Sequence, residues 1–126
     1  MKQLGQEALG CACQFLVTQA RPLERALFEH RFEGATVDSA LTELARFQNE
    51  DGGFGQALEP DLRTPSSSAL ATGIGLRMLR ELRCPVDHPM VRKAVAYLIA
   101  TYDNEAQVWQ ATSPDTNSFP HAPWWH

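Results

Sequence analysis

The sequence lacks the features of several large classes of protein. No stretch approaches the ~20 consecutive apolar residues that a membrane-spanning helix needs. Lysine and arginine number 11 against 15 aspartates and glutamates, which gives a formal net charge of -4 at pH 7. The chain therefore has no basic excess to attract nucleic acid or an anionic membrane. No segment alternates between apolar and polar residues with the period of two that half-buried strands show, so no sheet is predicted.

Cysteines are few, and their number is odd. Cys11, Cys13 and Cys84 cannot form a complete disulfide framework. Cys11 and Cys13 lie two residues apart in a helical pattern and face different directions, and no histidine lies nearby. We therefore expect core or partly exposed thiols, with a metal or redox site as the alternative. Polar residues such as Gln3 and Glu7 interrupt any apolar core of a signal peptide. We therefore expect a cytoplasmic protein.

Apolar residues recur at helical spacing along most of the chain, which has 126 residues and the length of one domain. Pro22 and Pro89 suit the first turns of helices, and a serine among residues 66–68 can cap another. The periodicity stops from Gln48 to Pro65. The pattern predicts an all-α fold of about five helices with long Gly- and Pro-containing connections, over residues 3–19, 23–33, 37–47, 67–82 and 89–102.

Gly73 and Gly75 fall inside the predicted helix 67–82. Each costs about 1 kcal/mol relative to alanine in a helix interior. Close packing against a neighbour, or a wall beside a cavity, would offset this cost. The apolar stripe of this helix is predicted from Leu70, Ile74, Met78 and Leu82, and its solvated polar face from Arg77, Arg80 and Arg83.

The chain resembles itself when displaced by 55 residues. Phe54 then meets Trp109, and with a one-residue gap Pro60-Asp61 meets Pro114-Asp115; further pairs are Leu44 with Ile99, Ala45 with Ala100, Phe47 with Tyr102, Asn49 with Asn104, Glu50 with Glu105, and Pro65 with Pro120. The copies span about 40–65 and 95–120. Because one helical hairpin cannot bury its own apolar face, such repeats stack. The second copy has no counterpart of helix 67–82. We therefore expect part of a larger array, or a homo-oligomer formed through an exposed helical face.

Residues 48–55 have the form Q-x-x-D-G-G-F-G, which resembles the QW motif of the squalene cyclase and protein prenyltransferase superfamily. Segments 57–62 and 120–125 look like largely uncharacterised bacterial prenyltransferase-like proteins of that superfamily. The resemblance covers roughly residues 37–125, and such proteins are normally about twice as long, so this chain looks like an N-terminal part. It implies stacked hairpins forming part of an α/α toroid, and a transferase or cyclase acting on an isoprenoid.

In the family the QW motif is structural, and the residues here suit that role; direct ligand contact is the alternative. Gln48 can both donate and accept where helix ends leave unpaired backbone groups. Asp51 can accept from backbone N–H groups in a turn. Gly52 and Gly53 permit positive φ, and Phe54 supplies apolar area.

Motifs for chemistry are missing. The sequence has no D-x-D-D acid motif of cyclases and no aspartate-rich Mg²⁺ site, and we place no Asp-Cys-His zinc triad in it. The best candidates for catalysis are Glu59 and Asp61, which can act as acid and base or hold a cation. In the alternative, Asp61 caps a turn and Glu59 is solvated or pairs with Arg63.

A second candidate cluster consists of His121, Trp124 and Trp125, which can bind substrate by stacking on a polyprenyl chain, a sugar or a cationic ligand. The alternative is packing against Tyr97 or Tyr102. Two hypotheses follow. In the first, the chain is an isoprenoid-binding, prenyltransferase-like protein; a carbohydrate-active α/α barrel is a related hypothesis in which it is also an enzyme. Alternatively, it is a non-catalytic α/α scaffold or binding module. No cofactor is indicated.

Overall fold

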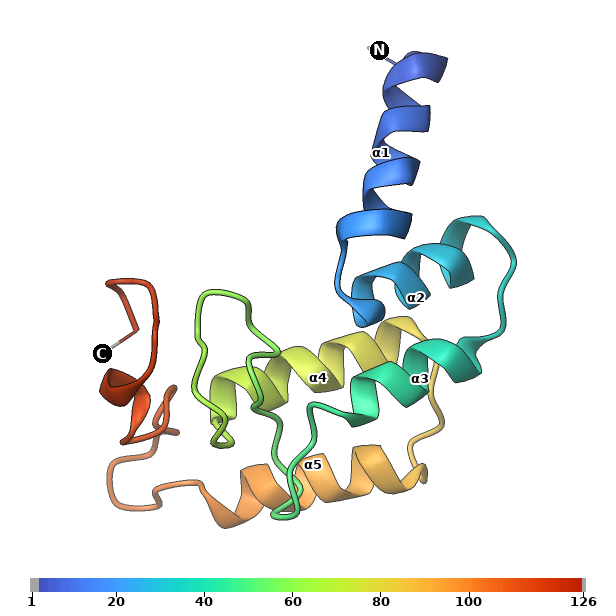
Figure 1. Cartoon of the computed structure of the whole chain (residues 1–126). Helices are drawn as coiled ribbons and strands as arrows, with labels where there is room; N and C mark the ends of the chain where they lie inside the picture. The colour runs from blue at the N-terminus through green and yellow to red at the C-terminus, as the bar shows by residue number, and fades with distance from the viewer. Residues whose placement is uncertain (1–2, 126) are drawn as a thin grey trace. The chain divides into compact units, whose positions relative to one another are not determined.

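The structure is a computed structural model that describes residues 3–125 (Figure 1). Over this range the chain forms five α-helices and one short 3-10 helix, Thr116–Ser118, and no strand, so the predicted all-α class is confirmed. Only isolated antiparallel bridges occur, such as Gln48 with Phe54. None of the helices described is long and apolar enough to cross a membrane.

The chain divides into two compact units, where the sequence pattern favoured one domain. Unit 1 extends to Glu43 and unit 2 begins at Leu44. The boundary falls within helix α3, Val37–Ala45. This helix ends two residues earlier than the pattern predicts, because the amide of Phe47 donates to Leu44 O, and that of Gln48 to Ala45 O, in tight turns.

Unit 1 contains helix α1, Gln6–Gln19, packed against helix α2, Pro22–Phe32. Pro22 occupies the first turn of α2, as predicted, and restricts Arg21 before it to extended backbone. Gly5 is also extended, so α1 begins three residues later than predicted. Leu23 and Ala26 of α2 are buried, whereas α1 has no buried residue.

Unit 2 is built on helices α4, Ala69–Glu81, and α5, Pro89–Ala100, which pack against each other (Figure 1). The Ser68 hydroxyl caps α4 by accepting from Ala71 N at 3.1 Å. At the start of α5, His88 Nδ1 accepts from Met90 N. Both caps satisfy amide groups that have no partner within the helix.

The buried face of α4 differs from the predicted stripe. Of the predicted stripe, Leu82 at the end of the helix is buried, whereas Leu70, Ile74 and Met78 are only half-buried. The buried residues within the helix are Ala71, Thr72, Gly75 and Leu79. The buried face is shifted because a large aromatic side chain packs on the glycine. Phe54 is fully buried, and a Cβ atom at Gly75 would lie 2.7 Å from its ring.

Candidate functional site

The Gln48 side chain joins a turn of unit 2 to a helix of that unit. Its amide Nε2 donates to the carbonyl oxygens of Gly52 and Met90, at 2.9 Å each. Met90 lies in the first turn of α5, 42 residues further along the chain. The side chain thereby ties the turn after α3 to the beginning of α5.

Asp51 organises the turn that follows. Its Oδ1 accepts from Gly53 N at 2.9 Å and from the Ser67 hydroxyl at 2.7 Å. Gly52 has φ +89, as expected, and a Cβ there would meet Lys93 O at 2.7 Å. For Gly53 the expectation of positive φ is wrong. That residue must be glycine for space, since a Cβ would lie 2.8 Å from the Tyr97 ring.

Tyr97 lies against this turn from α5. Burial raises the pKa of its phenol, and the charge of Asp51 raises that pKa further. The phenol therefore stays protonated at neutral pH, and it is a poor candidate for a general base.

Phe54 anchors the loop to α4. Its side chain is fully buried, and its amide donates to the Thr72 hydroxyl at 2.9 Å. Its carbonyl oxygen accepts from Ser68 N at 3.1 Å, next to the N-terminus of α4. Residues 48–54 thus form hydrogen bonds and packing contacts with one another and with neighbouring segments. These contacts favour the structural interpretation of the motif.

Asp61, of the first predicted cluster, is joined to Trp125, of the second; Glu59 is half-buried in the same loop. Asp61 Oδ1 accepts from the indole Nε1 of Trp125 at 2.8 Å, and Asp61 O accepts from Ala122 N at 2.8 Å. Arg63 N donates to Pro120 O at 3.0 Å. Asp61 therefore joins the loop to the C-terminal segment instead of capping a local turn. The Arg63 side chain donates to Pro60 O.

Trp124 and His121 are the other members of the second cluster. Trp124 is 68% exposed. The Phe119 carbonyl oxygen lies 2.6 Å from His121 Nδ1, so this ring nitrogen carries the proton. Trp125 bonds Asp61, whereas Tyr102 stacks with a different tryptophan, Trp109, at 4.6 Å between ring centroids.

The Asp115 side chain connects two segments of unit 2 by hydrogen bonds, and our sequence analysis did not single it out. Its carboxylate accepts from the hydroxyls of Ser66 at 2.7 Å and Thr64 at 3.2 Å, and also from that of Ser113. The hydrogen bonds from Ser113 and Ser66 lower its pKa. The repeat offered a signal, because it aligns Pro114-Asp115 with Pro60-Asp61. Asp115 bonds Thr64 at the end of the first copy, whereas Asp61 bonds Ala122 and Trp125, which follow the second copy.

The polar groups of the described chain do not assemble into a metal centre. Residues 3–125 contain no group of three or more His, Cys, Asp or Glu side chains that could hold an ion. Cys11, Cys13 and Cys84 are free thiols. Burial, together with Asp87, raises the pKa of the Cys84 thiol, which makes it a weak nucleophile at neutral pH.

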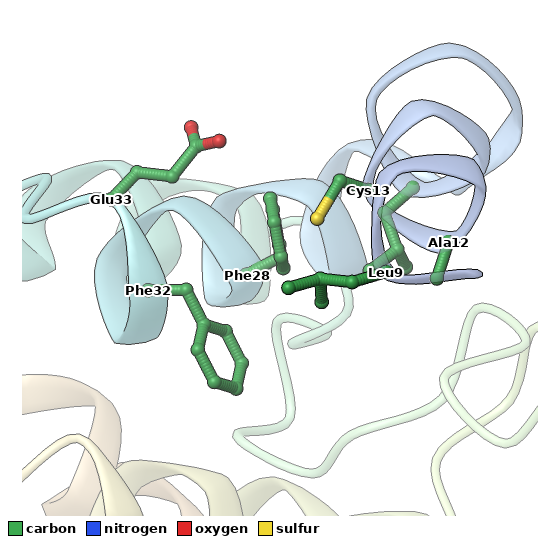
Figure 2. A pocket seen from close by; sticks show the side chains of 7 residues that line it. Leu9, Ala12, Cys13, Phe28, Phe32 and Glu33 are labelled. Atoms are coloured by element: carbon green, nitrogen blue, oxygen red, sulfur yellow. The ribbon is translucent and has the colours of Figure 1, made fainter. Parts of the chain in front are cut away.

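An apolar groove runs between α1 and α2 within unit 1, and our sequence reasoning missed it. Figure 2 shows Cys13 of α1 facing Phe28 of α2, with Glu33 at one end of the group. The groove holds about 440 Å³ and is lined by Leu9, Ala12, Cys13, Leu16, Phe28, Phe32 and Glu33. Glu33 is the one charged residue in this lining. In the sequence, the pattern that could have predicted this groove is an apolar stripe on each of two consecutive helices.

Comparison of the chain with protein-family models, with curated proteins and with solved structures found no match.

Proposed function

We propose that this chain is a helical binding module that holds a neutral, chain-like apolar molecule, such as an isoprenoid alcohol, between α1 and α2. The observation that carries the proposal is the groove itself. Its volume of about 440 Å³ lies within the ~300–1,000 Å³ typical of small-molecule sites, and six of its seven lining residues are apolar or a thiol.

Uncovered apolar surface on both helices supports this proposal. Leu9 is 51% exposed and Phe32 72% exposed, and both line the groove. Helix α1 has 14 residues and buries none of them. Because isolated helices of this length are marginal in water, a molecule that covers this face would stabilise α1 as well as bind to it.

The single negative charge in the groove lining favours neutral isoprenoids over isoprenoid diphosphates. A diphosphate group requires arginine, lysine or a bound cation, and the lining supplies only the carboxylate of Glu33. A neutral alcohol or hydrocarbon chain avoids this repulsion. The resemblance to isoprenoid enzymes supports the class of ligand, and the lining favours its uncharged members.

The positions of the two carboxyl groups considered for catalysis favour a binding role for this chain over a catalytic one. Neither Glu59 nor Asp61 is among the residues that line the groove. The Asp61 carboxylate already accepts from Trp125. We therefore assign unit 2 the role of a hydrogen-bonded scaffold. The free thiols favour a reducing compartment such as the cytoplasm.

Calorimetric titration with farnesol and with farnesyl diphosphate tests the proposal. We expect farnesol to bind more tightly than its diphosphate. Ala12→Trp, which fills the groove, should weaken binding at least about tenfold, a loss of ~1.4 kcal/mol. Val17→Trp is the matched control, because Val17 lies on the same helix and does not line the groove. Absence of farnesol binding, tighter binding of the diphosphate, or equal losses in both variants would refute the assignment.

A further inference from the structure

Gly73 is an exposed glycine in α4. It lowers the stability of the helix, and no packing within the described part of the chain requires a glycine there. Gly75, two residues away, receives the ring of Phe54. At Gly73 a Cβ would meet nothing within 4 Å. A helix-interior glycine destabilises by about 1 kcal/mol relative to alanine, and an exposed one leaves the backbone open to close approach by another surface.

A matching aromatic surface lies elsewhere on unit 2. We define the Trp109 patch as Val95 and Ile99, one turn apart on α5, with Trp109 and the half-buried Tyr102 that contacts it; Ile99 is 72% exposed and Trp109 47%. The indole is held in place by Tyr102 and by a hydrogen bond of 2.7 Å from its Nε1 to Leu98 O. A rigid, half-exposed aromatic group with aliphatic neighbours is typical of interface anchors.

The repeat shows how such an aromatic group is covered. Trp109 corresponds to Phe54, and Phe54 docks on a glycine of α4 with its ring against the helix. Within the described residues no helix covers Trp109 in the same way. The Gly73 face of α4 offers an equivalent glycine that is free to receive it.

The charges beside the two surfaces are complementary. Arg77 and Arg80 lie one and two turns beyond Gly73, are exposed, and form no ion pair within residues 3–125. Asp103 and Glu105 lie in the turn before Trp109 and are exposed. Since one chain carries both the basic and the acidic surface, a second copy is the partner that the charges favour.

A backbone hydrogen bond connects the two segments that carry these surfaces. Leu70 N, in the first turn of α4, donates to Ala111 O at 3.1 Å, two residues after Trp109. Both surfaces therefore belong to the same part of unit 2. In a two-fold dimer, each copy can present its Trp109 patch to the Gly73 face of the other.

We propose that unit 2 self-associates in this way: Trp109 of each copy packs on Gly73 of the other, and Glu105 faces Arg77 across the interface. The proposal does not depend on the groove of unit 1. Wild-type chain sedimenting at two concentrations should shift from monomer toward dimer, and added salt should weaken the association.

A charge exchange between copies tests the pairing. Arg77→Glu and Glu105→Arg, each alone, place like charges opposite each other at both contacts, so each should self-associate roughly tenfold more weakly than wild type. Mixed in equal amounts, they should form a heterodimer, since every contact then pairs unlike charges. Lys93→Glu, an equal charge change on an exposed residue of α5, should leave association unchanged.

The result that overturns the proposal is a wild-type chain that is monomeric at both concentrations, or a mixture that associates no better than the single variants. Far-ultraviolet circular dichroism should show that both variants are folded, because Arg77 and Glu105 are exposed. Gly73→Gln gives a second route: it adds a side chain in open space and favours the helix, yet it should block dimer formation.

Discussion

Two glycines of α4 provide a matched pair for testing the packing of unit 2. Replacement of either by alanine gains about 1 kcal/mol of helix propensity. At Gly73 the new methyl group meets nothing within 4 Å, so the free energy of unfolding should rise by about that amount. At Gly75 the methyl group would lie 2.7 Å from Phe54 Cδ2.

Such overpacking costs about 1–3 kcal/mol in a core. The phenyl ring cannot move away easily, because Phe54 is fully buried and its amide is bonded to Thr72. The net change for Gly75→Ala therefore lies between zero and a loss of about 2 kcal/mol. The two variants should differ by about 1–3 kcal/mol, although each makes the same chemical change.

Urea unfolding followed by tryptophan fluorescence measures this difference. All three tryptophans, Trp109, Trp124 and Trp125, belong to unit 2, so the signal reports that unit. Dilute samples keep self-association out of the comparison. Equal stabilisation by both alanines would show that Phe54 does not pack on Gly75, and the described core of unit 2 would be wrong.

Two further predictions concern Asp61 and Asp115, whose side chains bond distant segments of unit 2. Asp61→Ala removes the acceptor of the Trp125 indole; we expect a loss of about 1–3 kcal/mol in the free energy of unfolding and a red shift of the fluorescence, and an unchanged spectrum would contradict the bond. The lowered pKa of Asp115 means that its contribution is present above the pKa of the unfolded chain and is lost as pH falls through the folded value. The stability difference between wild type and Asp115→Asn should therefore shrink below about pH 4, and a difference that persists in acid would refute the role of the charged carboxylate.

The sequence predicted the helices better than their packing. Pro22, Ser68 and Pro89 mark helix starts through local chemistry, and the helices begin at or next to them. The buried face of α4 depends on where Phe54 inserts, some twenty residues earlier in the chain, and periodicity within the helix does not carry that information. The structure thus shifts the face toward Gly75.

The candidate site was predictable only in part. Asp51 accepts from a backbone N–H in its turn, which side-chain chemistry predicts, whereas the reach of Gln48 to Met90 depends on how α5 packs. The Asp61–Trp125 pair spans 64 residues, and each member was put forward separately for a different role. The groove escaped notice because a stripe of apolar residues on a helix normally indicates core, and sequence does not show that α1 leaves its stripe uncovered.

The central claim is that a neutral apolar chain occupies the α1–α2 groove. Isotope-filtered nuclear Overhauser spectroscopy of labelled protein with unlabelled farnesol tests it most directly. We predict cross-peaks from the farnesol methyl groups to the side chains of Leu9, Leu16 and Phe28, which line the groove. Cross-peaks confined to residues of unit 2, or none at saturating farnesol, would contradict it.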